Sequence, residues 1–480
     1  MSSAEDPGRK ELQPPTPTKS PMITSIIRLQ DLPTEILFQI CLELKNDDAS
    51  GVSRLSLTSR EFRDITMPHI FDRLSFTRPP THSNTTNGTK DSRIGLLRTM
   101  IKNSKIASEV KEIEDLLDGK GLLTKEDLDI IIQATKDLGL TPPEALTRLC
   151  QQLQPSETVG DIQFSLNHGA YEHLGCFMTE MLVAHTPNLR GWEYNVHGCS
   201  NAFKSLREAV GARIGMPLLP NLVDAYIELN GSADRVQPLA EAAPTLDSLW
   251  LTCIRGLQSD IQFNSVRVLI LTKTDLTAAE LKRLLCGFPG LKKFWFTSSH
   301  RSMRIGSNSQ LCRPQEVVDA LHALGLGITE LTLRFDSWGY NEPTQDPNVP
   351  LHGLLSSIRK LNKLENLDFD GMCFWGRSHS FNPSEIYDSV KAQPLAKLLP
   401  RGLKKLTLTD LKNGPFYKDL DILQEGISEV LPELEVLECG LRHRKRLPQD
   451  KVQYLTERFA AQGVRFQDLA SLHISDDEED

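Results

Sequence analysis

A spaced apolar pattern recurs along the chain from residue 189 to residue 439. The pattern is Leu-x-x-Leu-x-Leu, in which another apolar residue can take any of the leucine positions. It occurs at Leu189/Trp192/Tyr194, Leu222/Ala225/Ile227, Leu246/Leu249/Leu251, Val266/Leu269/Leu271, Leu291/Phe294/Phe296, Ile328/Leu331/Leu333, Leu364/Leu367/Phe369, Leu403/Leu406/Leu408 and Leu434/Leu437/Cys439. The last two apolar positions alternate with the residue between them, which predicts a short strand with one buried face at each occurrence.

Helical segments are expected between these strands, for example at residues 277–288 and 313–324. A strand and a helix of this size cannot bury their apolar faces alone, so stacking of neighbouring units would complete the core. The pattern resembles leucine-rich repeats, although successive motifs begin 20 to 39 residues apart. We therefore predict an α/β chain that ends in an irregular leucine-rich-repeat solenoid. The alternative is an ordinary α/β domain with a parallel sheet, whose buried strands would also be apolar.

A second apolar pattern lies near the N-terminus. Pro33 is expected to open a helix. The apolar stripe of this helix comprises Leu32, Ile36, Leu37, Ile40 and Leu44. Leu55 and Leu57 precede a further helical segment. A module of under about fifty residues cannot cover all these side chains in a core of its own, so part of its surface is expected to meet a partner.

This N-terminal module resembles an F-box, in particular that of filamentous-fungal proteins with leucine-rich repeats, in the segments LPTEILFQI, LSLTSREFRDI and MPHIFDRLSF. The resemblance covers about Leu29 to Phe76, with Phe62 and Phe71 where the family often has a tryptophan. It implies docking on a Skp-type adaptor and, through it, on a cullin. Carried over by position, the adaptor-binding residues would be Leu32, Pro33, Ile36, Leu37 and Ile40, supported by Leu55 and Leu57. The alternative is a plain helical hairpin that packs on the repeats.

The residue between the last two apolar positions of each motif is expected to point out of the sheet. Four consecutive motifs place a large apolar residue there, namely Tyr226, Trp250, Ile270 and Trp295. Aromatic residues clustered on a rigid surface are typical of binding hot spots, so we predict that a protein substrate binds here. The alternative is that the chain covers this stripe itself. A second candidate surface is formed by segments that begin at Ser337, Met372 and Gly414, expected to be loops, which carry Trp338 and Trp375 among other aromatic residues.

Composition divides the rest of the chain. Pro-, Ser- and Thr-rich or highly charged segments predict a disordered tail (1–27), a linker (78–92) and an acidic disordered tail (470–480). Between them we expect the F-box (28–77), a helical segment (93–185), the leucine-rich-repeat domain (186–447) and a C-terminal helix or cap (448–469).

Charge and motif content narrow the possible functions. The formal net charge of −9 argues against a nucleic-acid binder, and the nine cysteines form no CxxC pair, which favours a reduced protein of the cytoplasm, the nucleus or both. No membrane-spanning stretch, catalytic motif, cofactor motif or metal-ligand spacing is found in the sequence. We therefore expect a non-catalytic substrate receptor of a ubiquitin ligase that needs no cofactor. The alternatives are a protein-interaction scaffold with a diverged F-box and an enzyme with an unrecognised site.

Overall fold

The computed structural model describes residues 29, 32–47, 49–76, 92–115, 124–140, 142, 144–152, 168–196, 202–212, 217–298, 312–335, 355, 357–371, 373, 395–411, 415–441 and 447–472. The chain forms two compact units, divided between Ile70 and Phe71. No helix of the described ranges is long and apolar enough to cross a bilayer.

The first unit consists of three helices. They are α1 (Thr34–Asp47), α2 (Ala49–Ser56) and α3 (Arg60–Phe71, whose last residue lies past the unit boundary). Pro33 precedes α1, and its carbonyl oxygen accepts the first backbone hydrogen bonds of the helix. Leu37, Cys41, Val52 and Phe62 form the buried core, with side chains from all three helices.

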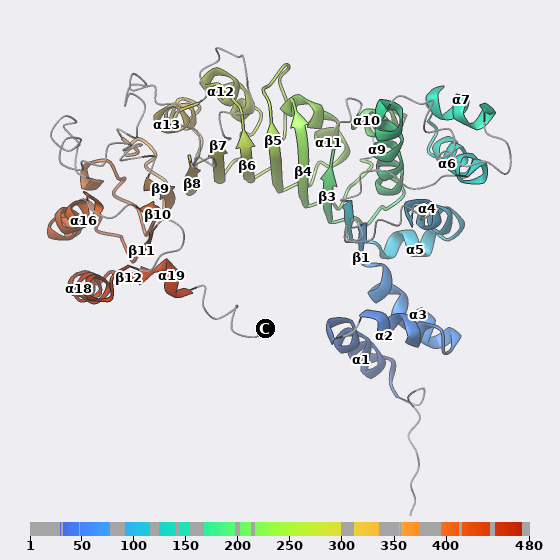
Figure 1. The fold of residues 1–480 in the computed structure, drawn as a ribbon, viewed down its shortest axis with the longest axis horizontal. Helices are drawn as coiled ribbons and strands as arrows, with labels where there is room; N and C mark the ends of the chain where they lie inside the picture. Colours follow the sequence, from blue (N-terminus) through green and yellow to red (C-terminus); the bar gives the residue numbers. More distant parts are fainter. Residues whose placement is uncertain are drawn as a thin grey trace, which may run out of the picture. The chain divides into compact units, whose positions relative to one another are not determined.

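The second unit is built on one parallel sheet. Its strands among the described residues follow the order of the sequence, each paired with the next, from β1 to β12 (Figure 1). They are β1 (Arg73–Phe76), β2 (Glu112–Asp115), β3 (Gly191–Asn195), β4 (Asp224–Gly231), β5 (Ser248–Ile254), β6 (Val268–Thr274), β7 (Lys293–Ser298), β8 (Glu330–Arg334), β9 (Asn366–Asp370), β10 (Lys405–Leu411), β11 (Val436–Leu441) and β12 (Arg465–Asp468).

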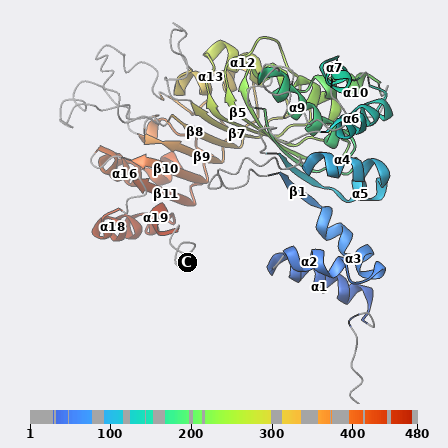
Figure 2. The ribbon, with the colours of Figure 1, turned by 45° about the vertical axis from the view of Figure 1, so that its right-hand side comes forward.

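Helices cover one face of this sheet. Within the second unit the strands follow an arc and the helices lie on its outer side, apart from the short α19 (Leu469–Leu472), which follows β12 on the inner side (Figures 1 and 2). The helices are α4 (Ser92–Lys102), α5 (Ser104–Glu109), α6 (Lys125–Asp137), α7 (Glu144–Gln152), α9 (His168–Ala184), α10 (Lys204–Ala212), α11 (Gln237–Ala242), α12 (Ala278–Cys286), α13 (Pro314–Ala323), α16 (Pro415–Glu425), α17 (Ile427–Val430), α18 (Gln449–Ala460) and α19 (Leu469–Leu472), with 3₁₀ turns η2 (Ala233–Val236) and η4 (Leu395–Lys397).

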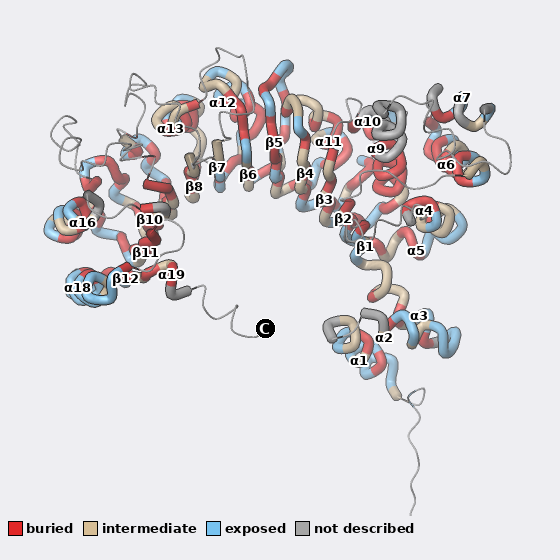
Figure 3. Tube along the Cα trace, viewed as in Figure 1, coloured by how far each residue is buried: buried red, intermediate tan, exposed pale blue. Residues whose placement is uncertain are grey.

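The core of the second unit lies between the sheet and these helices. One apolar cluster runs without a break from Phe76 of β1 to Phe466 of β12 (Figure 3). Each strand contributes alternate residues to it, as Leu249 and Leu251 of β5 do, because successive side chains of a strand point to opposite faces. Capping boxes fix two helix starts: Thr124 and Asp127 cap α6, and Thr277 and Glu280 cap α12.

The predicted fold was wrong in its architecture. A strand is present at each of the nine spaced motifs, and the α/β class is compatible with the structure. However, the chain does not form a helical segment followed by an irregular leucine-rich-repeat solenoid from residue 186. It forms one continuous parallel sheet that begins at Arg73, inside the segment assigned to the F-box, and ends at Asp468.

The helical segment was misjudged because it contains a strand. β2 lies within residues 93–185 and pairs with β1 and β3, and the surrounding helices pack on the same core. Asp115 of β2 is buried at a position where β3 to β11 carry an apolar residue, and it is paired with the buried Arg93 of α4 (Nη1 to Oδ2, 3.2 Å). A search for alternating apolar residues cannot detect such a strand.

Candidate functional site

The first candidate surface lies on the helical unit of residues 29–70. Ile36, Phe38, Leu42 and Leu57 expose large apolar side chains, and Leu57 is the most open at 77% exposed. Phe38 and Leu42 lie one turn apart on α1, and the Phe38 ring contacts the ring of His69 of α3 at a tilt of 52°, with 4.4 Å between ring centroids. Exposed apolar side chains in this number on so small a unit are typical of a protein-interaction surface.

The residues predicted to bind an adaptor do not share one environment. Ile36 is 47% exposed, and Pro33 is also exposed. Leu32, Ile40 and Leu55 are half-buried. Leu37 is only 1% exposed and belongs to the core of the unit, so its side chain is not available to a partner in this conformation.

Phe38 and Leu42 were not predicted as surface contacts. The predicted stripe followed the i, i+4 spacing of Leu32, Ile36 and Ile40, whereas Phe38 and Leu42 lie on another side of α1. The sequence did contain a signal for these two residues. The face of a helix that is turned to water usually carries polar residues, so large apolar residues outside the predicted stripe indicate a second contact surface.

The second candidate surface is the face of the sheet that carries no helices. Strand pairing places one residue of each strand opposite its neighbour in a single row across this face. From β1 to β12 the row is Ser75, Glu114, Glu193, Tyr226, Trp250, Ile270, Trp295, Thr332, Asp368, Thr407, Glu438 and Gln467. We call Tyr226, Trp250, Ile270 and Trp295 the aromatic row. Register brings these four predicted site residues onto adjacent strands.

The aromatic row is held by contacts within the sheet. The indole Nε1 of Trp250 donates to Thr272 Oγ1, and that of Trp295 donates to Thr297 Oγ1, both at 3.1 Å. The Tyr226 and Trp250 rings meet edge to face with 4.7 Å between centroids. Even so, Trp250 remains 37% exposed and Trp295 40% exposed.

On three adjacent strands, a residue with left-handed backbone conformation follows the aromatic row. Asn230 of β4, Cys253 of β5 and Lys273 of β6 have φ angles of 46°, 59° and 52°. The strand pairing shifts register at the same places, after Glu228 in β4 and after Leu271 in β6. Bulges of this kind turn the strand ends and are often found beside functional sites.

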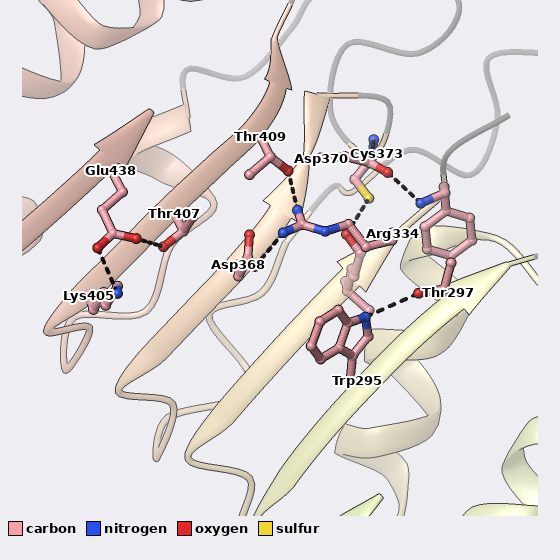
Figure 4. Close-up of polar contacts among 12 residues, drawn as sticks. Trp295, Thr297, Arg334, Asp368, Asp370, Cys373, Lys405, Thr407, Thr409 and Glu438 are labelled. Carbon is pink, nitrogen blue, oxygen red and sulfur yellow. Dashed lines mark hydrogen bonds and ion pairs between the residues drawn. The ribbon is translucent and has the colours of Figure 1, made fainter. Parts of the chain in front are cut away.

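One side of the row consists of paired charges (Figure 4). Arg334 of β8 is ion-paired with Asp368 of β9 and donates to the Thr409 hydroxyl of β10. Lys405 of β10 contacts Glu438 of β11, with Nζ 2.7 Å from Oε1. Burial raises the pKa of Asp368, an effect that Arg334 partly offsets. These strands therefore present a polar surface whose charges are mutually neutralised.

Asp370 lies deeper, at the end of β9. It accepts hydrogen bonds from the backbone amides of Phe335 and Cys373, and thereby holds the chain after β8 to the chain after β9. Burial raises its pKa to about 6, and the nearby Arg334 acts in the opposite direction. Its role is structural, because the side chain is only 1% exposed.

The other side of the row is acidic. β2, β3 and β4 place carboxylates on the same face as the aromatic row, namely Glu112, Glu114, Glu193, Asp224 and Glu228. Arg73 of β1 contacts the first two of these, at 3.7 Å and 3.4 Å. Burial and the charge of Glu114 raise the pKa of Glu193, which indicates that negative charge accumulates here.

The segments of the second predicted surface are described only in part. Trp338 and Trp375 lie outside the described residues. The segment that begins at Gly414 was expected to be a loop, but Pro415 begins α16, and Tyr417 packs partly buried against the core. This segment is therefore a helix start and not a free loop.

Titratable groups of the described ranges form no cluster of three or more metal-ligand residues. The cysteines in those ranges are all free thiols. Burial raises the pKa of Cys253, close to the aromatic row, to about 11, with the carboxylate of Glu228 adding to the rise. That thiol is therefore neutral at physiological pH and is a poor nucleophile.

No family model matches the chain. No curated protein matches it either.

Proposed function

We propose that the chain is a non-catalytic substrate receptor of a Skp-cullin-F-box ubiquitin ligase, which binds the Skp-type adaptor through α1–α3 and a protein substrate through the open face of the sheet. The observation that carries the proposal is the group of exposed apolar side chains on the helical unit, above all Ile36 and Leu57. It is supported by the resemblance of residues 29–76 to an F-box.

Burial of these side chains by a partner would be strongly favourable. Removing a whole leucine, isoleucine or phenylalanine side chain from water is worth about 1.5–3 kcal/mol, and Leu57 leaves most of that unrealised at 77% exposed. Ile36, Phe38 and Leu42 add smaller increments, because each is partly covered within the unit. A partner with an apolar groove could gain several kilocalories per mole from this surface.

The receptor would contribute proximity and no chemistry of its own. Holding a substrate lysine near a charged conjugating enzyme raises its effective concentration, which accelerates transfer without a catalytic residue on the receptor. The adaptor and cullin would place the protein in the cytoplasm or the nucleus.

Co-expression with a Skp-type adaptor tests the proposal. The wild-type chain should co-purify with the adaptor, and Ile36→Asp combined with Leu57→Asp should abolish co-purification, because the carboxylates would lose their water in the interface. Arg63→Asp is the matched control, since it changes the charge of the unit by the same amount at an exposed position of α3.

Two results would contradict the proposal. One is a well-folded wild-type chain that never associates with the adaptor, which would favour a scaffold whose F-box no longer binds it. The other is co-purification that survives the double aspartate variant, which would place adaptor binding elsewhere on the chain.

A further inference from the structure

We propose that the aromatic row, together with the carboxylates of β2–β4, binds an extended segment of the substrate that carries lysine or arginine side chains. The inference rests on the proposed function, because the bound segment would belong to the protein presented for ubiquitin transfer.

The state of the indole rings indicates what they can bind. Both N–H groups of the row, on Trp250 and Trp295, are already donated to threonine hydroxyls of the same sheet. The exposed part of each side chain is therefore mainly ring surface. The face of an indole attracts cations through its negative quadrupole, more strongly than any other side-chain ring does.

Carboxylates surround one end of the row. Glu193 lies directly opposite Tyr226 across the β3–β4 pairing. Asp224 and Glu228 flank Tyr226 on β4 itself, two residues to either side and therefore on the same face. Both Glu193 and Glu228 act on the Tyr226 hydroxyl, raising its pKa in addition to the larger effect of burial. Negative charge thus reaches the ring surface where a ligand cation would lie.

The charge on this part of the face is unbalanced. Its described strands β2–β4 carry the five carboxylates given above. Arg73 of β1 contacts Glu112 and Glu114, and Arg255 and Lys273 act on Cys253 beside Glu228, so these strands keep an excess of negative charge, centred on Glu193 and Asp224. On β8–β11 the cations and carboxylates pair with each other, as Arg334 does with Asp368 and Lys405 with Glu438. A cationic ligand is therefore favoured at the β2–β6 part of the row, and a phosphorylated or acidic segment is disfavoured.

The dimensions suit a short extended segment that crosses the strands. From Glu193 of β3 to Trp295 of β7 the row spans four strand spacings of about 4.8 Å each, or about 19 Å. An extended chain rises about 3.3 Å per residue, so about six residues cover this distance. The backbone groups of β4–β6 are engaged with strands on both sides, so recognition must use side chains and not added strand pairing.

The test measures binding of labelled peptides to the full chain by fluorescence anisotropy. The probe is a peptide of alternating arginine and glycine, and the counter-probe has glutamate in place of arginine. The arginine peptide should bind at least about tenfold more tightly, and its affinity should fall as salt is raised. Trp250→Ala should weaken it about tenfold, and Glu193→Gln combined with Asp224→Asn severalfold.

Control variants separate the site from general effects of charge and exposure. Glu241→Gln removes an exposed carboxylate from α11, and Tyr454→Ala removes an exposed ring from α18, so neither should change peptide affinity. Circular dichroism and the thermal midpoint of each variant should match those of the wild type. If Trp250→Ala lowers the thermal midpoint, Trp295→Ala provides the same readout from a second ring.

Four results would each overturn the inference. The chain could bind the two peptides equally, prefer the glutamate peptide, or bind neither, or its affinity for the arginine peptide could be the same in both tryptophan variants as in the wild type. Failure of the ligase proposal can be distinguished from failure of this inference. Co-purification with the adaptor depends on Ile36 and Leu57, whereas peptide binding depends on Trp250 and the carboxylates, so either property can be lost while the other remains.

Discussion

Replacement of Leu37 by alanine should strongly destabilise the helical unit, whereas replacement of its neighbour Ile36 should have a small effect. Leu37 is 1% exposed, and truncation of a fully buried leucine costs about 2–5 kcal/mol, including the cavity left behind. Ile36 is 47% exposed, so about half of its side chain is already in water and Ile36→Ala should cost about 1 kcal/mol.

Hydrogen–deuterium exchange of the chain without adaptor measures this difference. Amides of α1–α3 that exchange through opening of the unit should exchange at least about thirtyfold faster in Leu37→Ala, because about 1.4 kcal/mol corresponds to a factor of ten. In Ile36→Ala the same amides should change severalfold at most. The strands of the second unit serve as the internal reference, and their exchange should be unaltered in both variants.

A different outcome would refute the reasoning from burial. If Leu37→Ala left exchange in α1–α3 unchanged and weakened only adaptor binding, Leu37 would be an interface residue, as the F-box resemblance implied. The core assigned to Leu37, Cys41, Val52 and Phe62 would then be wrong.

Three further predictions concern stability. Asp370 keeps its proton to a higher pH in the folded chain (pKa about 6) than in the unfolded chain (3.8). The free energy of unfolding should therefore fall by about 3 kcal/mol as the pH rises through that interval. Urea midpoints should show this decline for the wild type but not for Asp370→Asn, and equal slopes would contradict it. Arg93→Ala leaves Asp115 buried without its cation and should cost about 3–5 kcal/mol, measured as a lower urea midpoint, whereas a midpoint equal to that of the wild type would refute the buried pair. Thr277→Ala removes the hydroxyl that caps α12 and should cost about 1 kcal/mol, with Thr277→Ser close to wild type in the same assay.

The strands of the sheet could be predicted where their inward residues are apolar. At each of the nine motifs the last two apolar residues mark a strand, and their fixed spacing also gives the register that aligns Tyr226, Trp250, Ile270 and Trp295. Three strands were missed. β1 has apolar inward residues but lies in the segment that was assigned to the F-box, and β2 and β12 each bury an aspartate, Asp115 and Asp468, at an inward position. The partners that make such burial possible come from elsewhere in the chain, so a local pattern does not reveal them.

The architecture and the helical surface were harder to predict. Apolar periodicity specifies that a strand or helix has a buried face, but not which other elements cover it. It could not show that residues 93–185 join the same core as the later strands. On α1 the stripe has a buried centre at Leu37 and Cys41 and two partly open flanks, and only the structure separates the flanks from the centre.

The most direct test of the central claim is the mass of the species formed when the full chain is co-expressed with a Skp-type adaptor, determined by size-exclusion chromatography with light scattering. The account predicts one species that exceeds the 53.8 kDa chain by the mass of one adaptor, and its loss on substitution of Ile36 and Leu57 by aspartate. A folded wild-type chain that elutes at 53.8 kDa, with the adaptor in a separate peak, would contradict it.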